Sequence, residues 1–273
     1  MAYADDLDPE ASVLAFYATD LRRKREDAGM KQSTLARLAN LSASMMNKIE
    51  AGKRLPTKLL SEVADDRFGT GDHFQRLWKL VIRYAYPAWF RPYLELETAA
   101  TVIRSHQVQV VHGLLQTEDY VRSMLTAARL DADTIAERLA ARLERQQILE
   151  RAAPPELWVS LDENVLRRQV GTPAVMRAQL ERLIAAAETP TTVIQVVPYA
   201  VGSHAGVGGP FSVLALDEGP HVVVVDGFLQ GQLLAEPSQV KAALRAYDLV
   251  TAVALSPGAS VDLIATIAKE LST

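Results

Sequence analysis

The segment spanning residues 31–56, KQSTLARLANLSASMMNKIEAGKRLP, constrains the fold more than any other part of the chain. It contains two short amphipathic helical patterns separated by a tight turn. In the first pattern Leu35, Leu38 and Ala39 share one face, and the small side chain of Ala36 lets another helix approach closely. The segment therefore predicts two short helices joined by a turn.

The residues around these patterns carry turn and cap signals. Asn40 tolerates the left-handed backbone that a tight turn often requires. Ser42 is placed to cap the second helix, since its hydroxyl accepts a backbone N–H that has no intrahelical partner. Gly52 can end that helix, with Pro56 a little beyond it.

The second helix has one apolar and one polar face, with Met46 and Ile49 turned inward. The outward positions carry small, amide and cationic side chains: Ala43, Ser44, Asn47 and Lys48. A major groove admits such a helix, so we expect these four residues to contact base edges of double-stranded DNA. Asn47 can pair with adenine and Lys48 with guanine, each worth about 1–3 kcal/mol of discrimination. A phosphate or solvent contact is the alternative for any one of them.

The charge distribution favours the same prediction. The chain has a formal charge of -4. Residues 21–60 nevertheless hold ten bases against three acids, a local charge of +7 that leaves -11 for the remainder. The bases predicted to contact DNA phosphates are Arg22, Arg23, Arg25, Lys53 and Arg54. The alternative is that the run at residues 22–25 is a solvated helix face, as most charge runs are. Glu50 is expected to pair with an Arg of its own domain.

Length and composition indicate a small domain followed by a larger one in a chain of 273 residues. The chain has no cysteine, which excludes disulfides and thiolate zinc sites and favours a reducing cytoplasm. The acidic first twenty residues lack the basic start of a secretory signal. No apolar stretch reaches the roughly 18–20 residues that cross a bilayer, so no membrane partner is expected.

The N-terminal part is predicted to be all-α. An acidic tail at residues 1–10 precedes a five-helix DNA-binding domain at residues 11–85, with further helices at residues 11–25, 58–67 and 73–83. The Pro-containing and aromatic stretch at residues 86–92 breaks the helical pattern, and the domain boundary is placed there.

Residues 86–273 are predicted to form an α+β domain with a mostly antiparallel sheet. Helices are expected at residues 93–105, from about 118, and at 131–151, 174–187, 237–249 and 261–271. Strands are expected at residues 157–161, 192–197, 211–216 and 221–226, with a further candidate at 229–234. The four consecutive valines at 222–225 favour a central strand that is covered on both faces.

Two sets of motifs resemble known families. The first set resembles the XRE-type helix-turn-helix of phage repressors: Gly29, Gln32, Leu35-Ala36, Leu41-Ser42, Ile49-Glu50, Gly52, Arg54 and Pro56. The second resembles the C-terminal domain of the actinobacterial WhiJ-like, antitoxin-like regulators: Trp89-Phe90, Leu96-Glu97, Ala100, Gly113 to Thr117, Tyr120, Arg142-Leu143, Arg145-Gln146, Leu161 to Glu163, Val165 to Arg167, Val197-Pro198 and Ala254 to Pro257.

These resemblances imply a transcriptional regulator that binds an operator and is modulated by a small partner protein encoded by an adjacent gene. They also imply that Gln32 braces a phosphate and the recognition helix. Lys31 stands where such helices usually have a Ser or Thr cap, and His112 stands where the C-terminal family usually has Pro.

Motifs for catalysis are weak, and neither an enzyme nor a cofactor or metal site is expected. The glycine-containing loop at residues 202–210 lacks the spacing of a phosphate-binding fingerprint and suits a hairpin-type connection. Of the adjacent acids Asp162 and Glu163, one is expected to cap the next helix. The three histidines His112, His204 and His221 lack metal-ligand spacing, and surface or loop positions are the default for them.

A single domain of this kind offers a limited interface, so tight binding favours a homodimer on two half-sites. The helix at residues 131–151 is one candidate dimer surface, although intramolecular packing is the commoner role for such an apolar side. An alternative is a regulator whose C-terminal domain binds a small-molecule effector, with Trp158, Tyr199 and Phe211 either lining the pocket or forming core.

Overall fold

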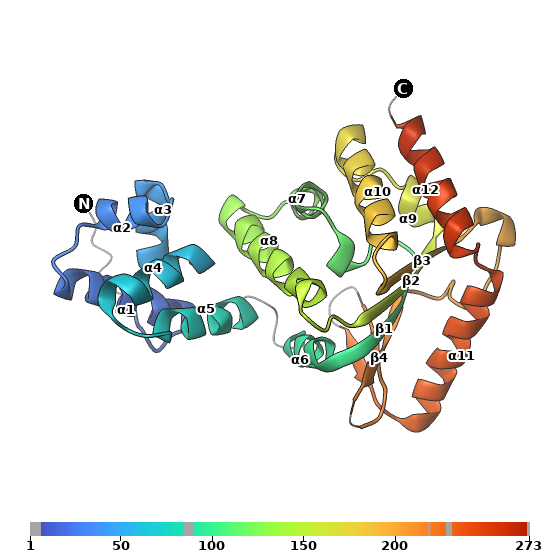
Figure 1. Ribbon diagram of the computed structural model, residues 1–273, viewed down its shortest axis with the longest axis horizontal. Coiled ribbons are helices and arrows are strands. Elements are labelled where there is room, and N and C mark those ends of the chain that lie inside the picture. Colours follow the sequence, from blue (N-terminus) through green and yellow to red (C-terminus); the bar gives the residue numbers. More distant parts are fainter. Residues whose placement is uncertain (1–6, 85–89, 218, 228–230, 272–273) are drawn as a thin grey trace. The chain divides into compact units, whose positions relative to one another are not determined.

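The computed structural model describes residues 7–84, 90–217, 219–227 and 231–271 (Figure 1). The chain divides into two compact units. The N-terminal unit combines Met1–Pro87 with Leu130–Glu144, and the C-terminal unit combines Ala88–Arg129 with Arg145–Thr273. The first residues of the predicted boundary at 86–92, Trp89 among them, lie outside the described residues.

Five helices build the first part of the N-terminal unit, as the sequence predicts. They are α1 (Val13–Asp27), α2 (Gln32–Leu38), α3 (Ala43–Glu50), α4 (Lys58–Phe68) and α5 (His73–Tyr84). Their shared core holds the fully buried side chains of Tyr17, Leu35, Met46, Ile49 and Phe74. The inward positions predicted for α3 are therefore confirmed, which fixes the opposite face of that helix as the outer one.

The predicted turn and cap signals are confirmed. Asn40 adopts a left-handed backbone with φ of 54°. The Ser42 hydroxyl accepts the backbone N–H of Met45 at 3.1 Å. Thr57 caps α4 in the same way, and Gly52 follows α3 with φ of 67°. Lys31 forms no side-chain cap, so α2 begins without this stabilisation.

One further helix in the described residues groups with the N-terminal unit, although the predicted C-terminal domain begins at residue 86. Helix α8 (Ala132–Gln146) lies within the range assigned to that domain, yet its residues up to Glu144 group with α1–α5. The reason is packing, because Ala140 and Ala141 contact the helical core. The last two residues of α8 belong to the C-terminal unit, so this helix is shared between the units.

The C-terminal unit contains a mixed six-stranded sheet in the described residues, with the order β3-β2-β1-β4-β5-β6. The strands are β1 (Ala100–Gln107), β2 (Glu156–Asp162), β3 (Thr192–Val197), β4 (Phe211–Leu216), β5 (Val222–Val225) and β6 (Gln232–Leu234). β1, β2 and β3 pair in parallel, whereas β1, β4, β5 and β6 pair antiparallel. Three of the five pairings are thus antiparallel, in agreement with the predicted sheet. The four-valine strand β5 lies between β4 and β6 and is buried on both faces, as predicted.

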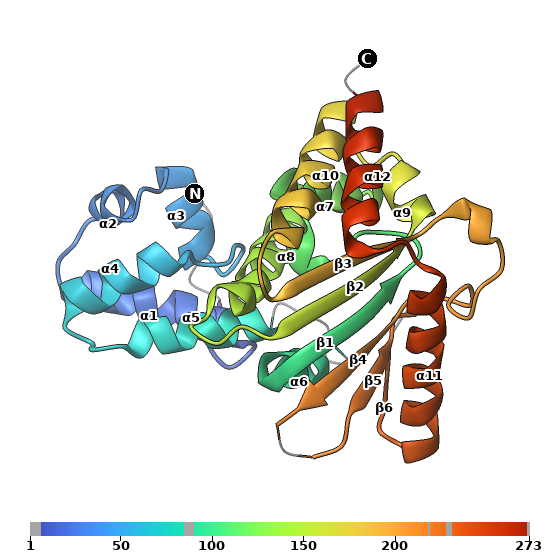
Figure 2. The same cartoon turned by 45° about the vertical axis from the view of Figure 1, so that its right-hand side comes forward.

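Helices cover both faces of this sheet (Figure 2). The helical segments of the unit are α6 (Arg91–Ala99), η1 (Gly113–Leu115), α7 (Glu118–Ala127), η2 (Gln147–Glu150), α9 (Glu163–Arg167), α10 (Pro173–Ala187), η3 (Tyr199–Val201), α11 (Pro237–Val253) and α12 (Pro257–Glu270). α10 and α12 pack on the main core side, where Leu214 and Val224 point. α11 covers the other side, where Val213 and Val223 point. Alternate residues of one strand therefore enter two different cores.

The helix predicted at residues 93–105 is wrong in its second half. α6 ends at Ala99, and the chain continues directly into β1, which hydrogen-bonds to β2 on one side and to β4 on the other. The β-branched residues Thr101, Val102 and Ile103 favour a strand, and two neighbouring strands satisfy its backbone groups.

A buried ion pair ties α6 to the end of α8 within the C-terminal unit. Arg145 donates to both carboxylate oxygens of Glu97, at 2.5 and 2.7 Å, and to the Tyr93 hydroxyl at 3.1 Å. Burial alone would raise the pKa of the Glu97 carboxyl, but the Arg145 guanidinium holds that pKa below its usual value. The Glu97 side chain is 1 % exposed, so it depends on Arg145 for compensation of its charge.

No single helix in the described residues is long and apolar enough to cross a membrane. Helices α11 and α12 reach that length and apolar composition only when they are taken together, and the pair is bent by 69°.

Replacing Arg145 by Met should lower the free energy of unfolding of the C-terminal unit by about 3–5 kcal/mol, because it leaves Glu97 buried without a counter-charge. The matched control is Arg122→Met, which breaks the exposed pair with Glu118 and should cost less than about 1 kcal/mol. Urea denaturation measures both. Equal losses for the two variants would contradict the role of the buried pair.

Candidate nucleic-acid interface

Helix α3 presents a polar outer face. Ala43, Ser44 and Asn47 are exposed, and the Lys48 side chain is 43 % exposed. Met45 contacts the helical core, so its side chain serves packing. The four base-contact candidates thus lie on one short helix whose opposite face is fixed in the core.

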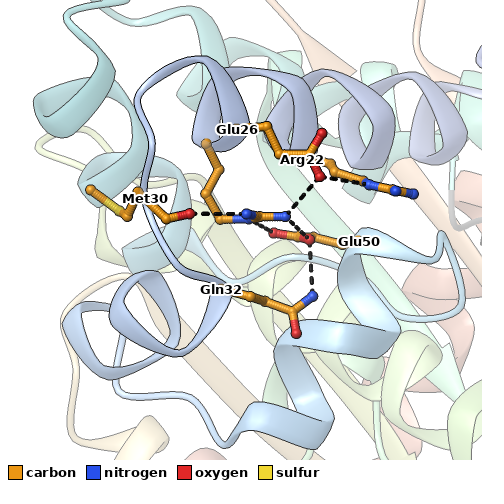
Figure 3. A network of polar contacts seen from close by, with 6 residues as sticks. Arg22, Glu26, Met30, Gln32 and Glu50 are labelled. Atoms are coloured by element: carbon orange, nitrogen blue, oxygen red, sulfur yellow. Dashed lines mark hydrogen bonds and ion pairs between the residues drawn. The ribbon is translucent and has the colours of Figure 1, made fainter.

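A buried polar network holds α3 against α1 and α2 (Figure 3). Arg25 of α1 donates through Nε and Nη2 to the two carboxylate oxygens of Glu50 on α3, at 2.6 and 2.9 Å. The same guanidinium donates to the Met30 carbonyl at 3.0 Å. Gln32, the first residue of α2, donates to Glu50 Oε2 at 2.9 Å. One carboxylate therefore links all three helices, and the expectation that Glu50 pairs with an Arg of its own domain is confirmed.

This network gives Arg25 an internal role instead of the phosphate contact that the sequence predicts for it. Its side chain is only 10 % exposed, and hydrogen bonding to Glu50 raises the pKa of the guanidinium. The charge is neutralised inside the domain, so we leave Arg25 out of the interface. Gln32 uses its amide N–H to brace the recognition helix, and a phosphate role for the same side chain stays a prediction.

The remaining basic candidates differ in their surroundings. Lys53 is exposed. Arg22 pairs with Glu26 on the same helix, and Arg23 pairs with Asp20 while its side chain stays 67 % exposed. The Arg22–Glu26 pair is exposed and therefore weak, so a phosphate can replace Glu26 as the partner of Arg22. The Asp20 carboxylate that holds Arg23 is itself only 5 % exposed. A phosphate contact stays a prediction for Lys53, Arg22 and Arg23.

Lys48 and Arg54 face a partner that the sequence did not reveal. The Lys48 ammonium lies 3.0 and 3.4 Å from the two carboxylate oxygens of Asp133, in the first turn of α8. Arg54 Nη1 lies 3.5 Å from Asp133 Oδ1. One base-contact candidate and one phosphate-contact candidate thus share a single carboxylate.

The C-terminal unit contains a second candidate site, a cavity of about 790 Å³ between α11, strands β4–β6 and the loop at residues 202–210. Phe211, Val223, Val225 and Leu234 form apolar walls, and the polar lining side chains are Gln107, Gln109, Asp226 and Gln239. Phe211 thus lies where the effector hypothesis placed it. Trp158 and Tyr199 do not line this cavity, and they are 37 % and 54 % exposed. The loop at residues 202–210 joins η3 to β4. A hairpin connects neighbouring strands, and β3 and β4 are not neighbours in the sheet, so the predicted hairpin-type connection is wrong.

Buried histidines lie beside this loop. His106 at the end of β1 is fully buried, and burial followed by repulsion from His204 lowers its pKa to about 4. His204 Nε2 lies 3.3 Å from the Asp162 carboxylate, and Asp162 also caps α9 as expected. Sequence reasoning missed His106, because the residues around it were assigned to a helix. His112 is buried as well, and it lies in the loop between β1 and η1, so the expectation of a surface or loop position holds for it as a loop position.

A metal has no evident site in the part of the chain that the structure describes, where no group of three His, Asp or Glu side chains is suitably placed.

Comparisons with known proteins match two separate parts of the chain, and the second match includes residues 130–144. Residues 17–77 match a model described as a helix-turn-helix domain. Residues 90–266 match the model of a domain of unknown function, DUF5753, and because this match covers more than half of the chain, the protein belongs to that family. No curated protein and no solved structure matches the chain.

Replacing Arg25 by Lys tests the bracing role, because it keeps the charge and removes the guanidinium fork. We expect the local stability of α3 to fall by about 1–3 kcal/mol, the range for hydrogen bonds to charged groups. Hydrogen exchange of the α3 amides measures this stability.

The control is Arg23→Lys on the same helix, which should change that stability by less than about 0.5 kcal/mol. If Arg25→Lys leaves exchange in α3 unchanged, the network does not hold the helix.

Proposed function

We propose that this member of the DUF5753 family is a sequence-specific DNA-binding transcriptional regulator. The observation that carries the proposal is the outer face of α3, where small and amide side chains are exposed while the inner face is locked in the core. The helix-turn-helix match over the same residues supports a DNA-binding regulator. In this proposal α3 enters a major groove, and Ala43, Ser44, Asn47 and Lys48 contact base edges.

The basic residues around α3 supply the charge that DNA phosphates require. Lys53, Arg54, Arg22 and Arg23 contact the backbone, which fixes the position of the helix and makes affinity depend on salt. A recognition helix of eight residues offers few base contacts. Operator binding therefore uses a homodimer on two half-sites about one helical turn apart.

The C-terminal unit serves assembly and control in this proposal. Its control ligand is a small partner protein that changes DNA binding, as in the regulators that the sequence resembles. None of these roles requires bond-making chemistry, so the protein is proposed to act by binding in the cytoplasm rather than as an enzyme.

Asn47→Ala tests base recognition most cleanly, because Asn47 is exposed on α3 and lies apart from the Asp133 contact. Selection from a randomised duplex library should give a defined site for the wild-type chain. For Asn47→Ala we expect preference at one base position of that site to be lost, by about 1–3 kcal/mol.

Lys53→Ala should instead weaken binding to every duplex and reduce the slope of log K against log salt by about 0.9, as expected for one lost phosphate contact. Lys269→Ala, at an exposed position of α12, is the charge-matched control and should bind as wild type does. A wild-type chain that selects no sequence at any salt concentration would overturn the proposed function.

A second candidate function is control by a small-molecule effector, and the C-terminal cavity favours it. The volume of about 790 Å³ falls in the range of ligand pockets, and apolar walls with a few polar groups are typical of them. With three amide side chains and one carboxylate in the lining, the cavity suits a neutral or weakly cationic amphipathic molecule.

Filling the cavity tests this candidate. Ala246→Phe places a ring in the cavity, whereas Ala252→Phe adds the same ring to an exposed position of the same helix. From a panel of neutral drug-sized compounds, we expect some to raise the melting temperature of wild type and of Ala252→Phe, and not that of Ala246→Phe. Equal responses of both variants, or no response in any of the three proteins, would contradict an effector site here.

A further inference from the structure

Helix α8 places an acidic surface against the basic surface of the helix-turn-helix domain. The Asp133 carboxylate contacts the Lys48 ammonium at 3.0 Å and the Arg54 guanidinium at 3.5 Å. Further along α8, Glu137 interacts with Arg54, and Glu144 interacts with Lys58 and Lys79 of α4 and α5. Three acids of one helix thus face four bases of the domain.

This arrangement is packed as well as charged. Ala141 is 1 % exposed and is part of the helical core, with Ala140 beside it. Glu137 and Glu144 are partly buried, and this burial raises the pKa values of their carboxyls. The contact between α8 and the domain is therefore an interface with an apolar centre and a charged rim.

The Asp133 carboxylate neutralises the Lys48 ammonium and draws it toward α8, since both carboxylate oxygens lie within 3.4 Å of Nζ. A DNA group that binds Lys48 must therefore compete with Asp133 for this charge. A carboxylate offers the same paired, negatively charged oxygens as a phosphate. Asp133 in the first turn of α8 also brings negative charge beside α3, which repels a phosphate backbone.

We propose that α8 is an intramolecular competitor of DNA: its acidic face binds the recognition helix and must leave Lys48 and Arg54 before these residues contact a duplex. The inference rests on the proposed function and adds a mechanism of control to it. The competing group is part of the chain itself, so it is present at a fixed high local concentration.

The end of α8 connects this competitor to the C-terminal unit. Arg145 is held by Glu97, and the Gln146 amide donates to the carbonyls of Gly113 and Gln116 at 2.9 and 2.8 Å. A ligand or partner that shifts these contacts changes the free-energy difference between α8 bound to the domain and α8 released from it. Regulation requires a ligand that favours one of these two states over the other.

Asp133→Asn in the full-length protein tests the proposal. It removes the charge that neutralises Lys48 and Arg54, and we expect affinity for a duplex of random sequence to rise about two- to tenfold, the effect of losing partly exposed ion pairs. Fluorescence anisotropy at fixed salt measures this affinity. The matched control is Asp119→Asn, which removes an acid from the second position of another helix, α7, and should leave affinity unchanged.

Hydrogen exchange of residues 132–144 provides the second readout, with and without a saturating duplex. Competition predicts faster exchange in α8 when DNA is bound. Unchanged affinity in Asp133→Asn together with unchanged or slower exchange would overturn the proposal while DNA binding itself remains. If neither the wild-type chain nor Asp133→Asn binds any duplex, the proposed function itself is wrong.

Discussion

The ion pair between Arg25 and Glu50 determines whether the rest of the N-terminal unit can present a recognition surface. Helix α3 has only eight residues, too few to be stable alone. Its orientation comes from the buried residues Met46 and Ile49 and from one carboxylate that α1 and α2 both contact. Breaking a buried pair leaves an uncompensated charge, so this network favours one arrangement of three helices over all others.

Helix α8 gives the two units a common element. Up to Glu144 it packs with the helix-turn-helix domain, and from Arg145 it belongs to the sheet-containing unit. Its acids pair with Lys48 and Arg54, and its end is held by Glu97. This helix therefore contributes residues to both units, those up to Glu144 to one and those from Arg145 to the other.

Much of this fold was predictable from local sequence. Periodicity and cap residues gave the five N-terminal helices, and apolar runs gave β3 and β4 residue for residue. Strand β1 was missed because Ala99 and Ala100 carry no turn signal between helix and strand. The pairs Arg25–Glu50 and Lys48–Asp133 join residues 25 and 85 positions apart, and no local pattern reports such contacts. The exposed face of α3 and an Arg partner for Glu50 were therefore predictable, whereas the choice of Arg25 as that partner and the position of α8 were not.

The central claim is that the outer face of α3 binds DNA. Backbone chemical-shift mapping by NMR, with the full-length protein titrated by its selected duplex, tests it most directly. We expect the largest shifts on residues 43–48 and on the first turn of α8, from which Lys48 is released. Shifts concentrated in the C-terminal unit, with residues 43–48 unchanged at saturation, would contradict it.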